Sequence, residues 1–312
     1  MTAIAPILPQ TIQLAVSILK RGGLVAMPTE TVYGLACDAA NPDAVARLYE
    51  AKGRPRFNPL IAHVSSIEMA QKEAEFNAAA SHTAAMHWPG PLTLVLPVAK
   101  GGTVCDLARA GLDTIALRMP AHKGARDLIS AFGGPLVAPS ANRSGHVSPT
   151  RAEHVKTDLD GRVDLILDGG PCEKGIESTI VDFTGERAVL LRTGALETSV
   201  LDKFLFGGIR RAGESDGISA PGQLKSHYAP NATLRLNAEA PEPGEAWLAF
   251  GPSKYPGLNL SPSGDLHEAA GRLFAALRAL DARHDRIAVA PIPNEGLGEA
   301  INDRLARAAH RD

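Results

Sequence analysis

Three positively charged side chains fall within five residues in the segment Lys52-Gly-Arg-Pro-Arg56. Arginine can bind a phosphate group through two parallel hydrogen bonds, and lysine binds the same group as a point charge. Proline fixes one backbone dihedral angle, so Pro55 and Pro59 favour a preorganised phosphate site here. Cations at the end of a helix also complement its dipole without any other role, and the segment alone leaves both interpretations open.

Two further segments combine hydroxyl groups with small residues. Pro28 to Gly34 is a hydroxyl-rich turn directly after an apolar run, where ligand-binding loops are often found. Ala138 to Gly145 supplies serine and asparagine for hydrogen bonds, and its small residues let the backbone approach a ligand closely. Arg118 and Arg192 each end an apolar run, which would direct a cation out of a sheet into a cleft. Ordinary turns and surface arginines give the same patterns, so no single segment decides the function.

Several common catalytic signatures are missing from the sequence. It lacks a GxxxxGK[ST] phosphate loop, a strand-linked GxGxxG, a zinc-binding HExxH and a nucleophilic GxSxG. The ten histidines are scattered without metal-ligand spacing, so we expect no metal ion bound by the protein alone. Nucleophilic triads and zinc-dependent hydrolysis are therefore disfavoured.

The elements that must position these segments indicate a mixed α/β domain up to about residue 205. Apolar residues at helical spacing predict helices at residues 11–20, 42–52 and 78–87. Apolar runs predict strands at residues 24–27, 60–64, 92–98, 114–118, 136–138, 163–167, 178–183 and 188–191. Asn41 is suited to cap the second helix and Gly53 to end it, which places the cationic segment between a helix and a strand.

A change of composition separates the last part of the chain. Residues 207–230 are rich in glycine, serine, proline and charge, with little periodicity, which is typical of a linker or an ordered loop. Beyond them the sequence predicts a strand at 247–250, a helix at 266–280, a strand at 287–290 and a helix at 297–305. Alternating strands and helices predict a small parallel α/β domain.

Length and composition agree with a two-domain globular protein. A chain of 312 residues exceeds most single cores, and 45% hydrophobic with 21% charged residues is a globular balance. The net charge of −2 argues against bulk electrostatic attraction to nucleic acid. Without an apolar run of roughly 18 residues or a signal-like N-terminus, we expect no membrane association and a cytoplasmic location.

Taken together, the motifs resemble the YrdC-like threonylcarbamoyl-AMP synthases over about residues 10–205. The residues that carry the resemblance are Pro28–Leu35, Lys52–Pro55, Asn58–Ile61, His63, Pro139–Asn142, Ser144-Gly145 and Glu177–Ile180. Ala220–Pro230 resembles the linker of the long, two-domain form of this synthase. One departure is that the linker consensus Lys-Tyr-Arg-His-Tyr reads Leu224-Lys-Ser-His-Tyr228, in which His227 and Tyr228 match but Ser226 removes a cation.

The resemblance implies a domain organisation. A YrdC-like catalytic domain with a mixed twisted sheet and helices would span residues 8–205. A linker loop at 206–230 would cover the active site. Residues 231–312 would form a C-terminal Rossmann-like parallel α/β domain.

The resemblance also implies a reaction. L-threonine, bicarbonate or CO2 and ATP would yield threonylcarbamoyl-AMP and pyrophosphate, the first step of threonylcarbamoyladenosine formation beside the anticodon of tRNAs that read codons beginning with A. A downstream threonylcarbamoyl transferase machinery would take the product, so tRNA would be involved indirectly. Because the carbamate of threonine itself attacks the α-phosphorus, no enzyme nucleophile is needed, and catalysis would be positioning and charge neutralisation. Mg²⁺ would be held mainly by the phosphates.

We expect Lys52 and Arg54 to face the phosphates, and we assign the catalytic roles to them. Residues for the two substrates follow from the resemblance by position. The residues implied for threonine are Thr31, His63, Arg118, Ala138 through its backbone, and Ser178. The residues implied for ATP are Arg54, Asn58, Thr114, Ser140, Ser148, Arg192 and Tyr228.

Two other functions remain open from the sequence. An RNA- or tRNA-binding module without catalysis could use Lys52, Arg54, Arg56 and Arg143 to meet a nucleic-acid backbone. A carbamoyl-transfer domain of the hydrogenase-maturation type would use carbamoyl phosphate, although the long form's linker and the absence of zinc-finger cysteines argue against it. Within the cationic segment, Arg56 is the member expected to be merely solvated.

Overall fold

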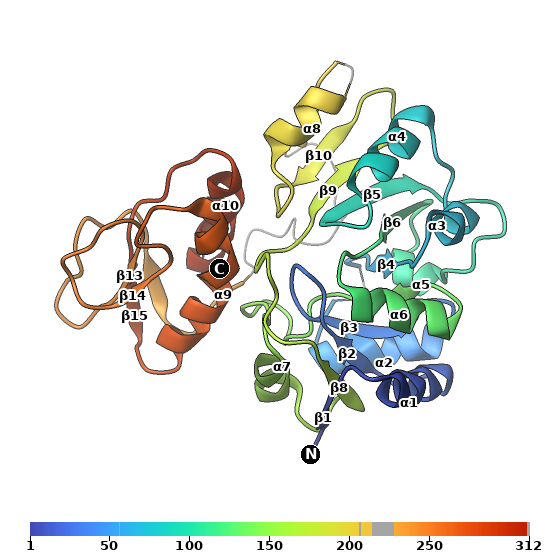
Figure 1. The fold of residues 1–312 in the computed structure, drawn as a ribbon, viewed down its shortest axis with the longest axis horizontal. Helices are drawn as coiled ribbons and strands as arrows, with labels where there is room; N and C mark the ends of the chain where they lie inside the picture. The colour runs from blue at the N-terminus through green and yellow to red at the C-terminus, as the bar shows by residue number, and fades with distance from the viewer. Residues whose placement is uncertain (56, 206, 214–227, 311–312) are drawn as a thin grey trace.

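The computed structural model describes residues 1–55, 57–205, 207–213 and 228–310. Figure 1 shows a larger body built from the first two thirds of the chain and a smaller one built from the last third. His227 and Arg56, together with most of the predicted linker, lie outside the described residues.

A single mixed sheet organises the larger body. Its strands run in the order β1-β8-β2-β3-β7-β4-β6-β5-β9-β10-β11, with both parallel and antiparallel pairs. Their bounds are β1 (Ala3–Pro6), β2 (Val25–Met27), β3 (Gly34–Asp38), β4 (Ile61–His63), β5 (Leu92–Pro97), β6 (Thr114–Arg118), β7 (Leu136–Val137), β8 (Leu165–Asp168), β9 (Thr179–Asp182), β10 (Val189–Arg192) and β11 (Arg210–Arg211). The predicted mixed sheet is therefore confirmed. β11 falls within the predicted linker and pairs with β10.

Helices cover this sheet on both faces. Their bounds are α1 (Pro9–Lys20), α2 (Pro42–Lys52), α3 (Ile67–Glu73), α4 (Ala78–His87), α5 (Asp106–Arg109), α6 (Lys123–Phe132), α7 (Ala152–Leu159) and α8 (Thr198–Phe204). α1 and α6 pack on one face of β2 and β8, while α2, α4 and α7 share the core on the other face. The sequence reading identified α1, α2 and α4 but missed the other five, which are mostly short.

One apolar cluster on the larger sheet is formed by strand residues, with no residue from the described helices. Ile61, Val95, Ala116 and Ile180, from four adjacent strands, form this small cluster with Leu191 packed against it. Side chains two residues apart in a strand point to the same face. His63 and Arg118 therefore lie on the same face as Ile61 and Ala116, which makes this face the floor of a possible site.

The end of α2 is fixed by residue types that the sequence reveals. Asn41 accepts hydrogen bonds from the backbone N–H groups of Asp43 (3.0 Å) and Ala44 (3.1 Å), and Pro42 occupies the first turn. Gly53 ends the helix in a left-handed conformation with φ of 60°, which costs glycine little. The helix thus delivers Lys52 and Arg54 to a defined place at the sheet.

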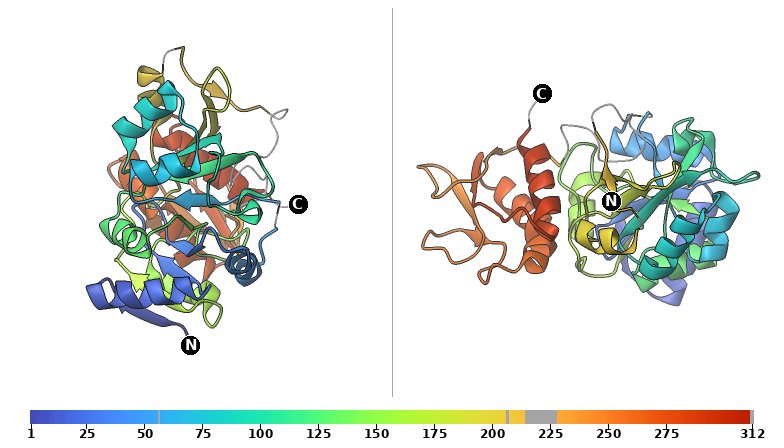
Figure 2. Two further views of the ribbon diagram at one scale, coloured as in Figure 1. Left: turned by 90° about the vertical axis from the view of Figure 1, so that its right-hand side faces the viewer. Right: turned by 90° about the horizontal axis from the view of Figure 1, so that it is seen from above.

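The smaller body is a four-stranded parallel sheet with two helices. The strand order is β12-β15-β13-β14, and every pair is parallel. The elements are β12 (Thr233–Arg235), β13 (Ala246–Ala249), β14 (Leu258–Asn259), α9 (Leu266–Asp281), β15 (Arg286–Val289) and α10 (Leu297–Ala309). This confirms the predicted parallel α/β domain. Figures 1 and 2 show α9 and α10 between this sheet and the larger body.

No helix among the described residues combines the length and the apolar character needed to cross a membrane.

Replacing the cap of α2 should weaken the fold without altering the site. We expect Asn41→Ala to lower the free energy of unfolding by about 1 kcal/mol, because two backbone N–H groups lose their acceptor. Urea-induced unfolding measures this change. Asn41→Asp keeps a side-chain oxygen that can accept at the same place and should retain most of the stability; equal losses in the two variants would contradict the capping role.

Candidate functional site

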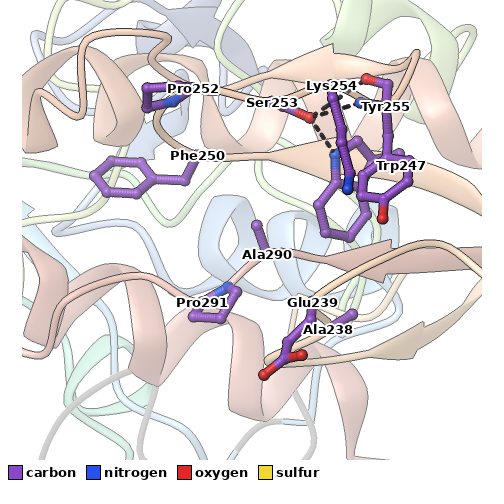
Figure 3. A pocket seen from close by; sticks show the side chains of 10 residues that line it. All are labelled: Ala238, Glu239, Trp247, Phe250, Pro252, Ser253, Lys254, Tyr255, Ala290 and Pro291. Atoms are coloured by element: carbon purple, nitrogen blue, oxygen red, sulfur yellow. Dashed lines mark hydrogen bonds between the residues drawn. The ribbon is translucent and has the colours of Figure 1, made fainter.

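The structure contains several hollows, and two of them differ clearly in chemistry. The larger, of about 660 Å³, lies in the C-terminal domain and is lined mainly by aromatic and small side chains, including Trp247, Phe250 and Tyr255 (Figure 3). Its described lining includes none of the predicted site residues. The smaller lies in the larger body, where several motifs meet. Size favours the first hollow, but the density of buried charge makes the second the candidate site.

The described lining of the second hollow brings together eight of the predicted site residues. They are Arg54, His63, Arg118, Ala138, Ser140, Ser178, Arg192 and Tyr228. Val32, Ile61, Pro139 and Glu177 complete the lining. These residues come from segments that are distant in sequence and meet where β4, β6 and β10 end and β9 begins.

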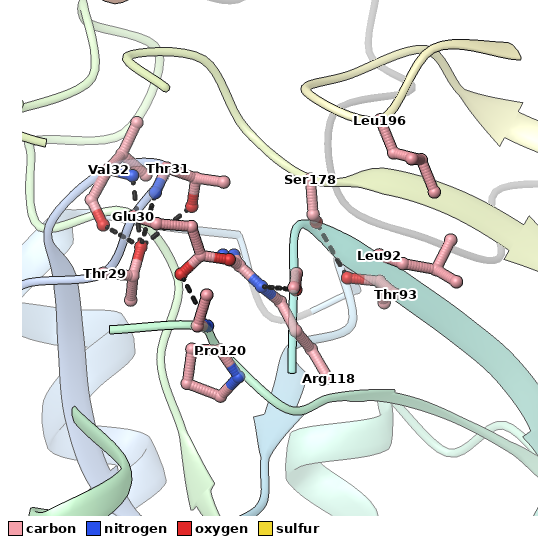
Figure 4. Close-up of polar contacts among 12 residues, drawn as sticks. Thr29, Glu30, Thr31, Val32, Leu92, Thr93, Arg118, Pro120, Ser178 and Leu196 are labelled. Carbon is pink, nitrogen blue, oxygen red and sulfur yellow. Dashed lines mark hydrogen bonds and ion pairs between the residues drawn. The ribbon is translucent and has the colours of Figure 1, made fainter. Parts of the chain in front are cut away.

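Arg118 forms a buried ion pair at the end of β6. Its terminal nitrogen donates to Glu30 Oε1 at 2.7 Å, and both side chains are about 5% exposed. Glu30 Oε2 also accepts from the backbone N–H of Ala121 at 3.0 Å. Burial raises the pKa of Glu30, but the charge and hydrogen bond of Arg118 more than offset this and hold it below its usual value. Figure 4 shows the two side chains pointing toward each other.

His63 lies beside Arg118, its register partner in the neighbouring strand. Burial, and then the Arg118 charge, lower the pKa of His63 to about 3. The imidazole is therefore neutral at pH 7. Nδ1 lies 3.2 Å from the carbonyl oxygen of Ile61, and a carbonyl can only accept, so Nδ1 carries the proton. Nε2 is left as a hydrogen-bond acceptor.

Arg192 and Ser178 form one unit at the opposite wall. Arg192 Nε and Nη2 donate to the Ser178 carbonyl at 3.1 and 2.9 Å, and Nη2 also contacts Ser178 Oγ at 3.2 Å. Ser178 Oγ lies 2.8 Å from Thr93 Oγ1, as Figure 4 shows. The Arg192 guanidinium is thus fixed with few degrees of freedom.

Arg54 is buried at the edge of the hollow with part of its hydrogen-bonding capacity unused. Its Nη2 donates to the Pro59 carbonyl at 3.2 Å. Neither Arg54 Nε nor Asn58 Oδ1 has a hydrogen-bond partner within the described part of the chain, although both are buried. Burial lowers the pKa of Arg54 to about 10, and the Arg192 charge contributes. Buried polar atoms without partners are costly, so these two are suited to a ligand.

Lys52 holds a loop together. Its ammonium donates to the carbonyl oxygens of Ser140 (2.6 Å) and Asn142 (2.5 Å) and is almost fully buried. Burial, followed by the Arg54 charge, lowers the pKa of Lys52 well below its usual value. In this arrangement Lys52 positions the Pro139–Asn142 loop. Its contact with phosphate stays a prediction.

Three other predicted residues lie away from the described lining. Thr31 is buried, with Oγ1 2.8 Å from Thr29 Oγ1. Thr114 begins β6, about 13 Å from Arg118 for four residues of extended strand. Ser148 is fully buried and donates to Glu177 Oε1 at 2.6 Å, so it reaches the hollow through that carboxylate. Their ligand contacts stay predictions.

The sequence reading missed the two carboxylates of the site. Glu30 and Glu177 both stand inside motifs that were recognised, but neither received a role. Their arginine partners lie 88 and 127 residues away in sequence. The sequence feature that could have identified them is a carboxylate within a motif otherwise made of small or hydroxyl-bearing residues.

Comparison with known proteins gives a consistent result over nearly the whole chain. Residues 17–194 match a family model described as "Telomere recombination", and residues 195–310 match one described as "Threonylcarbamoyl-AMP synthase, C-terminal domain". The chain is 41% identical to a threonylcarbamoyl-AMP synthase of Pyrococcus abyssi, covering 96% of this chain and 94% of that one. It is 38% identical to the Bacillus subtilis enzyme of that name, with coverage of 96% and 93%.

A solved structure agrees with the computed one. The crystal structure of P. abyssi Sua5 complexed with L-threonine superposes with a TM-score of 0.90 at 38% sequence identity. The match covers 99% of this chain and 97% of the other.

Removing the charge of Glu30 should destabilise the fold, because the buried charge of Arg118 then has no carboxylate partner. We expect Glu30→Gln to lower the free energy of unfolding by about 3 kcal/mol at pH 7, because breaking a buried pair leaves a buried charge behind. The folded-state pKa of Glu30 lies below 4.5, so this stabilisation is present above pH 4.5 and is lost as the pH falls through the folded value. Urea-induced unfolding at several pH values measures both effects.

The matched control is Asp127→Asn, which breaks the exposed pair between Lys123 and Asp127. We expect a change within about 0.5 kcal/mol. Equal stability of wild type and Glu30→Gln at pH 7 would show that the buried pair is not needed.

Proposed function

The chain belongs to the YrdC-like threonylcarbamoyl-AMP synthase family, and from this we propose that its hollow of buried cations binds L-threonine and ATP and joins them with bicarbonate. The product is threonylcarbamoyl-AMP, with release of pyrophosphate. The relative solved with L-threonine supports threonine as one substrate. The roles of ATP, bicarbonate and the individual side chains rest on the chemistry of the hollow.

The observation that carries the proposal is the excess of buried positive charge around one hollow. Arg54, Arg118 and Arg192 all line it, and each is less than a tenth exposed. They are close enough to affect one another: the Arg192 charge lowers the pKa of Arg54, and burial followed by other charges, including Arg118, lowers that of Arg192. An anionic ligand would relieve this repulsion. A carboxylate and a triphosphate are two such ligands.

Threonine fits the end of the hollow at Arg118. A guanidinium presents paired donors that match the two oxygens of a carboxylate. His63 Nε2, as an acceptor, is suited to the substrate's amine or hydroxyl, and Ser178 Oγ can exchange hydrogen bonds with the same groups. The backbone at Ala138 and the hydroxyl of Thr31 complete the set that we propose for threonine.

ATP fits the side of Arg54 and Arg192. Arg54 Nε and Asn58 Oδ1 are buried and lack hydrogen-bond partners within the described residues. We propose that Arg54 and Arg192 contact phosphate oxygens, while Asn58, Ser140 and Tyr228 hold the rest of the nucleotide. Ser148 supports this side through Glu177. Thr114 is included on the family resemblance alone.

The chemistry requires positioning and charge neutralisation. The threonine amine attacks bicarbonate-derived CO2 and loses a proton, which gives a carbamate. A carbamate oxygen then forms a bond to the α-phosphorus, while the bond from that phosphorus to the pyrophosphate oxygen breaks. Fixed guanidinium groups stabilise the charge that develops on the phosphates. Ordered side chains hold the two reactants in line.

We propose that Mg²⁺ enters with ATP and is held by phosphates and water. The described lining offers one carboxylate, Glu177, whose oxygens are already bonded to Ser148 and Arg304. Among the residues described, no group of three or more His, Cys, Asp or Glu side chains could hold a metal ion. Because Mg²⁺ prefers carboxylate and water oxygens, the side chains here suit the phosphates rather than the metal.

Burial weighs against the alternative of a purely RNA-binding module. Lys52 and Arg54 are nearly inaccessible, and Lys52 is committed to two backbone carbonyls. Arg143 is exposed, and Arg56 lies outside the described residues. A nucleic-acid backbone needs cations at the surface. A cytoplasmic location, indirect involvement of tRNA and transfer of the product to a threonylcarbamoyl transferase remain predictions that follow from the proposed reaction.

Loss of the Arg54 guanidinium should stop the reaction. We expect Arg54→Ala to reduce threonine-dependent pyrophosphate release by at least about 100-fold, since a fixed donor to the phosphates disappears. Circular dichroism establishes that the variant is folded. The control is the exposed Arg143→Ala, which should keep wild-type turnover; near-normal turnover of Arg54→Ala would remove this residue from the site.

The paired N–H donors of the Arg118 guanidinium should determine the affinity for threonine. We expect Arg118→Lys to raise the KM for threonine about tenfold or more, because an ammonium cannot bind both carboxylate oxygens in the same plane. The KM for ATP should change far less. Titration of threonine at saturating ATP measures the effect, and an unchanged threonine dependence would contradict the assignment.

A further inference from the structure

One charged side chain of the C-terminal domain is fully buried where this domain meets the larger body. Arg304, on α10, has no exposed surface, although the charged side chain of arginine usually lies at the surface. Its Nε donates to Glu177 Oε2 at 2.9 Å, its Nη2 to the Thr193 carbonyl at 2.8 Å, and its Nη1 to Asp303 at 2.6 Å. All three nitrogens of the guanidinium are therefore engaged, and two of them contact the larger body.

Arg304 leads directly to the wall of the candidate site. Glu177 lines the hollow and precedes Ser178. Its second oxygen accepts from Ser148 Oγ at 2.6 Å. Burial raises the pKa of Glu177, but the charges of Arg304 and Arg192 more than offset this, so the carboxylate is ionised at pH 7. Arg304 thus fixes a carboxylate that in turn fixes Ser148.

The same arginine contacts Tyr228, another residue of the wall. The guanidinium carbon lies 5.3 Å from the centre of the Tyr228 ring, within the range of a cation–π interaction. Phe274, on α9, stacks on that ring at 5.5 Å with an interplanar angle of 26°. Tyr228 adopts a positive φ of 65°, which is unfavourable for a residue with a bulky side chain. Contacts from the C-terminal domain therefore help to hold a strained residue in the hollow.

Stability alone is a poor reason to bury this arginine. Replacing a buried ion pair by apolar side chains of similar volume is often neutral or stabilising, because the desolvation of both charges is avoided. Two packed helices could join the domains through apolar contacts. The Arg304 side chain does more than join the two domains. Two of the side chains that it contacts, Glu177 and Tyr228, line the hollow.

We propose that Arg304 is a positioning residue for the synthase reaction, which makes the C-terminal domain part of the catalytic site. This inference rests on the proposed function, because the wall that Arg304 supports is the one assigned to ATP. Arg304 does not reach the hollow itself, and it acts by holding Glu177, Ser148 and Tyr228 in place.

A second interdomain arginine provides a matched control. Arg278, on α9, pairs with Asp158 at 2.5 Å, and its Nε donates to the Ser148 carbonyl at 3.3 Å. It contacts neither Glu177 nor Tyr228 in the described interactions. Arg278→Met should therefore weaken the docking of the two domains, whereas Arg304→Met should weaken the docking and also disturb the wall.

The test compares Arg304→Met, Arg304→Lys, Arg278→Met and the exposed Arg272→Met by threonine-dependent pyrophosphate release, with ATP and threonine varied separately. We expect Arg304→Met to lower kcat/KM for ATP about 10- to 100-fold, the scale of a small misplacement in a catalytic site. The KM for threonine should stay within about threefold. Arg304→Lys keeps the charge beside Glu177 and should recover part of the loss. Arg272→Met should match wild type.

Three outcomes would overturn the inference. These are normal kinetics of Arg304→Met, an equal loss in Arg278→Met, and a loss confined to the KM for threonine.

Absence of pyrophosphate release by wild type would instead refute the proposed function. A crystal structure of Arg304→Met then decides the inference by itself: displaced Glu177 and Tyr228 support it, and unchanged positions contradict it. If Arg304→Met does not fold, the same measurements on Arg304→Lys and Glu177→Gln decide it.

Discussion

Burial of positive charge is the constraint on which the site depends. A charge removed from water must be paired or hydrogen-bonded, or it destabilises the fold by several kcal/mol. Two carboxylates, Glu30 and Glu177, compensate one arginine each. Backbone carbonyls bind the other cations of the site, so the excess positive charge is held in place by dipoles. Five cations share this situation: Lys52, Arg54, Arg118, Arg192 and Arg304.

The use of carbonyls as partners explains why the motifs are rich in small residues and proline. Lys52 binds the carbonyls of Ser140 and Asn142, and Arg54 binds that of Pro59. A loop can turn several carbonyls toward one cation only where its backbone is not committed to a sheet or a helix. The cations therefore organise the loops, and the loops keep the cations without neutralising them. A site of this kind is preorganised for anions.

The sequence predicts the regular elements better than the site. The sequence predicts a helix such as α2 from a capping residue at Asn41, apolar periodicity and a terminating Gly53, all within about a dozen residues. The short helix α5 carries too few residues to show any period. Pairing of Arg118 with Glu30 or of Glu177 with Arg304 depends on contacts between residues far apart in the chain, which no local pattern encodes. The family resemblance predicts ligand contacts for residues of the motifs. Lys52 is expected at the phosphates, and its contacts with backbone carbonyls are visible only in three dimensions.

The two arginines at the domain boundary show why docking and catalysis can be separated in this fold. Arg278 and Arg304 are both connected to Ser148. Arg278 donates to the Ser148 carbonyl, and Arg304 donates to the carboxylate that the Ser148 hydroxyl contacts. A domain that served only to shield an apolar face would not need a charge at either place. Because Glu177 lines the hollow and accepts a hydrogen bond from Arg304, a shift of α10 would be transmitted to the wall assigned to ATP. The C-terminal domain is thus coupled to the site through a short chain of hydrogen bonds, in addition to the apolar cluster that Val32, Val147 and Ile176 share with α9 and α10.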